Sequence, residues 1–389
     1  MNTTSPTSNK GPLSGIRVLD LSRVLAGPWC SMTLADLGAD VIKVESPQGD
    51  DTRTWGPPFL EGAHGKMSAY FACCNRNKRS MTVDLHTDEG KKIVHELAKT
   101  ADVVLENFKT GGAEKLGVGY DDLKAINPKL VYCSISGYGR TGAEKDRPGY
   151  DFVIQAETGL MSITGDVTGQ PAKVGVAISD LCTGQNAAIA ILAALVSRGT
   201  TGQGQRIDIS LFDTQLQLLA NIASNVLFSG KDAPRWGNAH ANIVPYQAFE
   251  ASDAWFVLAI GNDRQWQHLC ELIEKPEWAA LGHDYATNPG RVTHRTVLVP
   301  LLAKLIAQKP ADYWLDALKA KGVPCGKVHS MKEALERTTP LTQPHPALGF
   351  DVPTVPSALN LSATPVVAHR PPPALGEHTA EIMAELGLA

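Results

Sequence analysis

The sequence predicts an α/β protein built from a large doubly wound, Rossmann-like domain and a smaller α+β domain. In the first half of the chain, short apolar segments of strand type alternate with helical segments, which is typical of a parallel sheet with helices on both faces. After about residue 205 this alternation stops, and a hairpin pattern surrounded by helices follows. The length of 389 residues is enough for two or three domains at about 150 residues each.

The strands predicted in the first half are short, apolar and bounded by turn residues. In chain order they are Ile16–Leu21, Val41–Val44, Met81–Leu85, Val103–Glu106, Leu130–Ile135 and Val174–Ile178. Helical spacing of apolar residues predicts helices between and after them, at Trp29–Leu37, Thr87–Thr100, Tyr150–Met161 and Thr183–Arg198. Gly38 suits the C-terminal cap of the first of these helices.

The second half predicts a smaller unit and a returning tail. After a short β-type segment at Arg206–Ser210, the patterns predict a hairpin and several helices: Phe212–Phe228, the hairpin strands Val244–Phe249 and Trp255–Ile260, then Arg264–Ile273, Arg295–Gln308 and Ala311–Lys321. A Pro-rich stretch then predicts an extended strap, and Thr379–Leu386 a last helix. We therefore expect a large domain over 1–205, a connecting helix over 206–228, a small domain over 229–335, and a strap and helix over 336–389 that return to the large domain.

Composition excludes several classes of protein. A net charge of −4 argues against a nucleic-acid or polybasic membrane surface, although local basic clusters remain compatible with it. The longest apolar run, Ala187–Val196, is about half of a bilayer span. The seven cysteines include no CxxC pair, which favours a reducing cytoplasm over disulfides or zinc. No HExxH motif or i,i+4 histidine pair occurs, so no metal site is expected.

The segment Gly137–Gly142 matches the G-x-G-x-x-G pattern of dinucleotide-binding loops and follows a predicted strand. Such a loop needs a helix to begin at it, but the charged segment Ala143–Pro148 comes next. A glycine turn is the favoured interpretation, and an NAD-dependent oxidoreductase remains a weaker alternative.

Two aspartates stand at predicted helix starts. Asp151 begins the helix near Tyr150–Met161, and Asp180 follows the predicted strand Val174–Ile178. Each suits a helix cap, and Asp180 also suits chemistry because ligands of doubly wound sheets bind beyond the carboxyl ends of strands. The residues alone leave both interpretations open.

The chain resembles the class III CoA-transferases (the CaiB/BaiF type, which includes formyl-CoA transferases) from near residue 13 to its C-terminus. The motifs that carry the resemblance are Gly15–Asp20, Ala26–Pro28, Leu37–Glu45, Asn77–Ser80, Ala101–Phe108, Asn127–Pro128, Ser136–Gly139, Arg147–Asp151, Val323–Gly326 and Leu375–Thr379. The resemblance implies a transferase that uses CoA and acyl-CoA as substrates and keeps no permanent cofactor. It also implies an interlaced homodimer with its active site between subunits.

The resemblance assigns the catalytic role to Asp180, which would attack the donor thioester and carry the acyl group and then CoA as covalent intermediates. By motif position, the residues that contact CoA in the family are Leu25, Ala26, Val83, Asn107, Phe108, Lys109, Lys115, Tyr150 and Asp151. Two positions depart from formyl-CoA transferases: Lys115 replaces an Arg, and Ser46 replaces an Arg that contacts the adenine side in some members.

Within the family, Arg235–His240 followed by Ile243–Phe249 is most similar to the succinate–hydroxymethylglutarate branch, which moves CoA between short dicarboxylates. We expect Arg235 or His240 to bind the distal carboxylate of the substrate; packing of these residues against a partner subunit is an equal alternative. A racemase of the same fold is the main alternative function. Tyr150 stands where the racemases have a catalytic His, and a phenol is a poor proton acceptor at neutral pH.

Overall fold

A six-stranded parallel sheet forms the centre of the structure, a computed structural model that describes residues 11–366 and 368–388. The strands lie in the order β5-β2-β1-β6-β7-β8. Their bounds are β1 Arg17–Asp20, β2 Asp40–Glu45, β5 Lys78–Thr82, β6 Val103–Glu106, β7 Val131–Ser136 and β8 Arg206–Ser210. Counted along the chain this is the order 3-2-1-4-5-6 of doubly wound folds, so the predicted Rossmann-like fold is confirmed.

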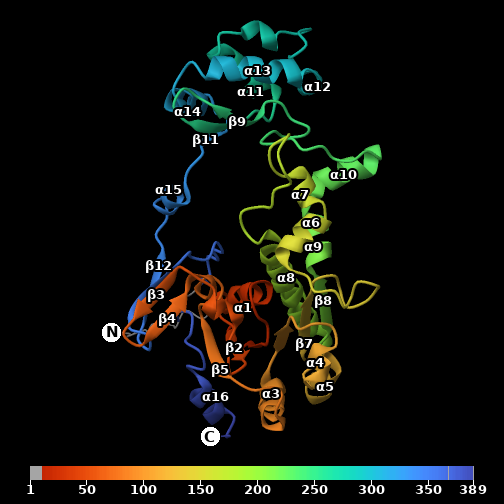
Figure 1. Ribbon diagram of the computed structural model, residues 1–389, viewed down its shortest axis with the longest axis vertical. Helices are drawn as coiled ribbons and strands as arrows, with labels where there is room; N and C mark the ends of the chain where they lie inside the picture. Colours follow the sequence, from red (N-terminus) through yellow and green to blue (C-terminus); the bar gives the residue numbers. More distant parts are fainter. Residues whose placement is uncertain (1–10, 367, 389) are drawn as a thin grey trace, which may run out of the picture. The chain divides into compact units, whose positions relative to one another are not determined.

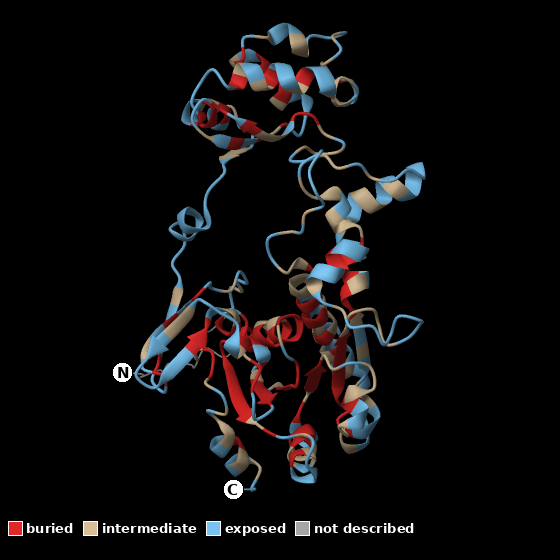
Figure 2. Cartoon of the chain, in the orientation of Figure 1, coloured by how far each residue is buried: buried red, intermediate tan, exposed pale blue. Residues whose placement is uncertain are grey.

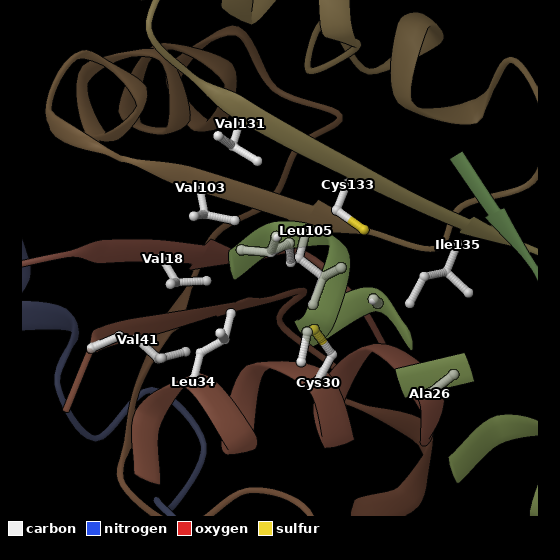
Figure 3. Close-up of a cluster of buried hydrophobic side chains, with 14 of the residues drawn as sticks. Val18, Ala26, Cys30, Leu34, Val41, Val103, Leu105, Val131, Cys133 and Ile135 are labelled. Carbon is white, nitrogen blue, oxygen red and sulfur yellow. The ribbon is translucent and has the colours of Figure 1, made fainter. Parts of the chain in front are cut away.

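Helices cover both faces of this sheet (Figure 1). Successive residues of each strand point to opposite faces, so every strand contributes side chains to the packing on both sides. Val18 and Val103 pack with α1 (Ala26–Asp36), α6 (Asp151–Glu157) and α8 (Ile178–Thr201), whereas their neighbours Leu19 and Val104 pack with the opposite layer. Figure 3 shows Val18, Val103 and Val131 of the strands lying opposite Leu34 of α1. The opposite layer contains α3 Asp88–Thr100, α4 Gly112–Lys115, α5 Tyr120–Ile126 and α16 Thr379–Glu385. The strands and α1 are correspondingly buried (Figure 2).

The chain forms two compact units. Unit 1 contains the described residues up to Thr158, Val174–Ala220 and those from Thr339 on. Besides the sheet and its helices, it holds α2 Ala69–Ala72, α9 Leu211–Leu218 and the hairpins β3 Phe59–Gly62 with β4 Gly65–Ser68 and β12 Leu341–His345 with β13 Phe350–Thr354. Side chains of the two hairpins pack with Phe71 in a small core. The first half of the Pro-rich strap is therefore ordered by the pairing of β12 with β13.

Unit 2 consists of Gly159–Lys173 and Asn221–Thr338. It is a three-stranded antiparallel sheet with helices: β9 Tyr246–Glu250, β10 Trp255–Ala259, β11 Cys325–Lys327, α7 Leu160–Ile163, α10 Ala220–Ser229 (all but its first residue), α11 Asp263–Leu272, α12 Asn288–Thr293, α13 Arg295–Ile306, α14 Ala311–Ala320 and α15 Met331–Leu335. Its own core gathers Phe256, Trp266, Leu298 and Trp314. The predicted hairpin and α+β character are therefore present.

Two of the expected elements differ in the structure. Val174–Ile178 is not a strand, because Gly175 interrupts it, Val176 is 54% exposed, and α8 begins at Ile178. The sixth strand is instead β8, which pairs with β7. This strand lies beyond the division expected at residue 205.

The helix expected over Phe212–Phe228 is divided into α9 and α10. Ala220, at the start of α10, has φ = 43°, a left-handed conformation that cannot continue a helix.

The C-terminal segment covers the free edge of β5, the outermost strand of the sheet. Asn77 N–H donates to the Arg370 carbonyl at 3.0 Å, and His378 N–H donates to the Ser80 carbonyl at 2.9 Å. Arg79 of β5 binds Glu385 of α16 at 2.5 Å. The predicted return of the tail to the large domain is thus a set of hydrogen bonds along one strand.

Among the described helices, α8 is long and apolar enough to cross a bilayer by length and composition. Its residues Ala187, Ile191 and Ala194 lie buried in the core between α1 and the sheet. Core helices of this kind meet the same criteria as membrane spans.

Candidate functional site

A cavity of about 390 Å³ lies beyond the carboxyl ends of β1, β6 and β7 in unit 1, where the strand order reverses. Doubly wound sheets bind their ligands at this point. Three loops line it, namely residues 23–26 after β1, 107–110 after β6 and 136–150 after β7, together with Gly112 of α4, Asp180 of α8 and Leu211 of α9. Seven predicted site residues meet here: Leu25, Ala26, Asn107, Phe108, Lys109, Tyr150 and Asp180.

Asp180 lies in the first turn of α8 and faces the cavity. Burial raises the pKa of its carboxyl group, and the negative charge of Asp151 raises it further, to about 7. A carboxylate of such high pKa is more basic, and so more nucleophilic, than an ordinary aspartate, yet about half of it is ionised at neutral pH.

Asp151 is the first residue of α6 and is fixed beside Asp180. Its Oδ1 accepts the N–H of Ser179 at 2.8 Å, and its Oδ2 accepts Nε2 of Gln155 at 2.6 Å. The helix caps are Tyr150 for α6 and Ala177 for α8. Neither aspartate is the N-cap residue of its own helix, but Asp151 accepts a first-turn amide of α8.

The loop after β1 is held by the predicted residue Asn107. The Asn107 side chain accepts the N–H of Arg23 at 2.9 Å and donates to the Arg23 carbonyl at 2.8 Å. The next residue, Val24, has φ = 71°, a left-handed conformation that is strained for a β-branched side chain. Buried Asp50 accepts the Val24 N–H at 3.2 Å and pairs with Lys43 at 2.9 Å. These contacts keep the first turn of α1 at the cavity wall.

A buried ion pair between Arg140 and Glu106 fixes the loop after β6. Arg140 lies 2.9 Å from Glu106 and donates to the Phe108 carbonyl at 2.8 Å, while Phe108 N–H donates to Glu106 at 2.7 Å. Arg140 belongs to the glycine-rich segment Gly137–Gly142. A Cβ on Gly137 would lie 2.6 Å from the Cα of Gly149, so this glycine serves a close approach of two backbones. No helix begins between β7 and α6, as expected for a glycine turn.

A second cavity of about 510 Å³ adjoins the first, since Arg23 and Phe108 line both. Val83 lines this second cavity, together with Ser46. The second cavity borders the strand ends of β2 and β5, and the first borders Asp180.

Lys109 lines the Asp180 cavity, but Lys115 lines neither cavity and is exposed at the end of α4. Four cations that were not predicted from the sequence also line the Asp180 cavity: Arg23, Arg140, Lys145 and Arg147. Arg147 stands in the Arg147–Asp151 motif, which was the signal available for it in the sequence.

In unit 2, the side chains of Arg235 and His240 form hydrogen bonds with other residues of the same unit. Arg235 donates to the carbonyls of Ser162, Asp166 and Gly169 at 3.2, 3.1 and 2.5 Å. His240 Nδ1 accepts the N–H of Asn242 at 3.0 Å. The guanidinium of Arg235 is therefore largely occupied by backbone.

The loop that follows Arg235 is tied to the helices of unit 2. Asn288 and Arg291 bind the backbone of Val244 at 3.2 and 2.7 Å, and Arg295 binds the Ala241 carbonyl at 2.7 Å. These bonds give the loop a fixed backbone. Among residues 11–366 and 368–388, no group of three or more His, Cys, Asp or Glu side chains is arranged to hold a metal ion.

Comparison with known proteins gives a consistent result. The family model described as "CoA-transferase family III" matches residues 13–379. The succinate–glutarate CoA-transferase of Agrobacterium fabrum is 45% identical over 98% of this chain and 98% of its own length. The human succinyl-CoA:glutarate CoA-transferase is 43% identical over 98% of this chain and 87% of its own length.

Among solved structures, a CAIB/BAIF family protein from Brucella suis is similar to this chain with a TM-score of 0.85 and 46% identity. The similarity covers 97% of this chain and 100% of that one.

Proposed function

Since the chain belongs to CoA-transferase family III, it is an enzyme that transfers CoA, and we propose that it moves CoA from succinyl-CoA to glutarate or a similar short dicarboxylic acid such as hydroxymethylglutarate. The names of the relatives at 43–45% identity support this choice of substrates. The observation that carries the proposal is Asp180, a half-buried carboxylate of raised pKa that faces the cavity at the switch point of the sheet.

The proposed reaction uses Asp180 as a nucleophile. Its carboxylate attacks the thioester carbonyl and the carbon–sulfur bond breaks, so that CoA leaves as a thiolate and the acyl group remains on Asp180 as a mixed anhydride. The thiolate then attacks the aspartyl carbonyl, which releases the free donor acid and leaves an aspartyl-CoA thioester. The acceptor carboxylate attacks this thioester and expels CoA thiolate, which leaves a second mixed anhydride. The thiolate then attacks the acceptor carbonyl of this anhydride, which gives the new acyl-CoA and restores the Asp180 carboxylate.

The two adjoining cavities support a binding path for CoA. The predicted contacts Val83, Phe108 and Lys109 lie along it, and the first turn of α1 at Leu25 and Ala26 lies at its Asp180 end. Backbone amides of a first helical turn have no partner within the helix, and here they are available to stabilise the developing oxyanion. The cations Arg23, Lys145 and Arg147 support binding of the phosphates, whereas the exposed position of Lys115 gives it no such support.

The distal carboxylate of the acceptor was expected to bind Arg235 or His240. We propose that His240, whose Nε2 makes no hydrogen bond among the described residues, binds this carboxylate. Arg235 then anchors the loop that carries His240. Replacing His240 with Ala should raise the KM for glutarate well above its effect on a monocarboxylate, whereas equal effects would remove this assignment.

A homodimer is also proposed. Apolar side chains of α8 are left exposed in the single chain, with Ile189 64% and Val196 75% exposed. Ile189 lines a groove of about 880 Å³ between α1, α8 and the strap. Exposed apolar surface of this extent favours a protein partner. Light scattering on the purified chain should give twice the monomer mass. A cytoplasmic location stays a prediction.

The test of function is an exchange assay. Labelled glutarate incubated with succinyl-CoA should become a labelled thioester, and Asp180→Ala should abolish this exchange while CoA binding by calorimetry persists. A racemase would scramble the configuration of a 2-methylacyl-CoA without moving label between acid and thioester. Exchange that survives in Asp180→Ala would contradict the proposal.

A further inference from the structure

A buried polar network behind Asp180 has no part in the reaction described above. Gln155 of α6 and Gln215 of α9 are buried, and they bind Asp151 and Ser179, the latter being the residue before Asp180. Gln155 donates to Asp151 at 2.6 Å and accepts the Val174 N–H at 2.9 Å. Gln215 accepts the hydroxyl of Ser179 at 2.8 Å.

This network holds the carboxylate of Asp151 in one position. Both of its oxygens accept hydrogen bonds from uncharged donors, the Ser179 N–H and the Gln155 amide. Among the described residues, no cation forms an ion pair with Asp151. These donors bring no positive charge to Asp151, and its negative charge acts on Asp180.

The other titratable groups around the pair do not neutralise it. Tyr70 of α2 faces both aspartates, and burial together with the charge of Asp180 raises the pKa of its phenol to about 12, so it stays neutral. The charged groups across the cavity come from its loops: Arg23, Lys109, Arg140, Lys145, Asp146 and Arg147. Of these, Arg140 is paired with Glu106, Arg23 with Asp51, and Arg147 with Glu144 and Glu157.

Acylation changes the charge of Asp180. When its carboxylate attacks a thioester, the oxygen–carbon bond forms, the carbon–sulfur bond breaks, and the electron pair leaves on sulfur. The aspartyl anhydride and the aspartyl thioester carry no charge at residue 180. The repulsion from Asp151 is therefore present in the free enzyme and absent in both covalent intermediates.

We propose that Gln155 and the Ser179 amide fix Asp151 as a negative charge that raises the energy of the free Asp180 carboxylate and so favours its acylation. Asp151 and Gln155 are thus positioning residues, and Asp151 is not assigned a contact with CoA. This inference rests on the proposed function, because it requires Asp180 to be the group that is acylated.

The test compares Asp151→Asn and Gln155→Met with the wild-type enzyme. Asp151→Asn keeps the shape and an acceptor for the Ser179 N–H but removes the charge, and Gln155→Met removes one of the two donors. Asp121→Asn is the matched control, because it removes an exposed carboxylate from α5, which lines neither cavity. Each protein is incubated at pH 8 with succinyl-CoA without acceptor, and the fraction carrying an adduct on Asp180 is measured by mass spectrometry.

In Asp151→Asn the ratio of acylated to free enzyme should fall about tenfold, and the acid limb of kcat/KM should move about one unit to lower pH, since one pH unit equals a factor of ten. Gln155→Met should lower the ratio of acylated to free enzyme and shift the acid limb in the same direction, but by a smaller amount. Asp121→Asn should leave the ratio and the acid limb unchanged. A purely structural role of Asp151 would lower activity without moving the acid limb.

The outcomes separate the two proposals. If the wild-type enzyme forms no adduct on Asp180, the proposed function fails. If it does, and folded Asp151→Asn keeps both the adduct ratio and the acid limb, the role assigned to Asp151 is wrong. Folding of each variant is checked by circular dichroism and CoA binding. If one of the two variants does not fold, the other still tests the role assigned to Asp151.

Discussion

The raised pKa of Asp180 makes the free energy of unfolding depend on pH in a way that Asp180→Asn should reveal. The carboxyl group has a pKa of about 7 in the folded protein against a reference value of 3.8. The neutral form is therefore favoured by the fold. The stability that it contributes is complete below about pH 4, decreases as the pH rises, and is lost above about pH 7.

The size of the effect follows from the gap between the two pKa values. A gap of about three pH units corresponds to about 4 kcal/mol at 1.36 kcal/mol per unit. Since Asp180 is half-buried and solvent screens part of the repulsion, we expect about 2 to 3 kcal/mol. Asn is neutral at every pH. The advantage of the variant over wild type should therefore increase by up to about 1.4 kcal/mol per unit between pH 4 and 7 and then remain constant.

The measurement is guanidinium unfolding of both proteins at one fixed protein concentration, at pH 5, 6, 7 and 8. Asp121→Asn serves as the control, because this exposed residue should show the same pH profile as wild type. The Asp180→Asn enzyme should be more stable at pH 8 and inactive in CoA transfer. A stability difference that is the same at all four pH values would refute the reasoning, since it would show an ordinary carboxyl group at residue 180.

Three further predictions concern the supports of the site. Asn107→Ala removes both hydrogen bonds to the loop after β1, so steady-state kinetics should show a several-fold higher KM for acyl-CoA with a smaller change in kcat. Arg140→Met leaves buried Glu106 without its cation, so chemical denaturation should show a loss of about 3 to 5 kcal/mol; a loss below about 1 kcal/mol would contradict this. Truncation before Arg370 exposes the edge of β5, so light scattering should show concentration-dependent aggregation that the full chain lacks.

The central sheet could be predicted from the sequence where periodicity decides the structure. β1, β2, β6 and β7 are apolar runs buried on both faces, and their predicted bounds agree with the observed ones within about one residue. β8 could not be predicted as part of this sheet, because Arg206 and Asp208 are exposed and give it the pattern of an edge strand. Only its pairing with β7, about 70 residues away, places it there.

The start of β5 was missed for a related reason. Lys78 and Arg79 are charged, so the strand was expected to begin at Met81. Both side chains are nevertheless buried, because Lys78 pairs with Asp20 at 3.2 Å and Arg79 with Asp40 at 2.7 Å. Asp40 lies on the neighbouring strand β2 and Asp20 on β1, one strand further, and local patterns carry no information about these partners.

Many residues of the candidate site could be predicted from the sequence, but the raised pKa of Asp180 could not. Asp180 was expected at a strand end and lies instead in a first helical turn, yet it still faces the predicted edge of the sheet. Its raised pKa depends on Asp151, 29 residues away, and on the walls of the cavity. The arginine expected to bind substrate, Arg235, is occupied by carbonyls of residues 162–169, which no local sequence pattern indicates.

The acids that end β1 and β6 have a common role in this fold. β1 ends at Asp20 and β6 at Glu106, and both carboxylates are buried. Asp20 accepts the N–H of Ser22 at 2.9 Å, and Glu106 accepts the N–H of Phe108 at 2.7 Å. In both loops the acid binds the amide two residues further on and turns the chain away from the strand direction.

Each of these acids is matched by a buried cation from another part of unit 1. Lys78 lies 3.2 Å from Asp20, and Arg140 lies 2.9 Å from Glu106. Burial of such pairs contributes little net stability, but loss of one partner leaves an uncompensated charge and is costly. The pairs therefore fix loop geometry more than they stabilise the fold. Motif residues such as Asp20 and Glu106 act by holding the loops that line both cavities, so substituting them should weaken CoA binding without removing a contact to CoA.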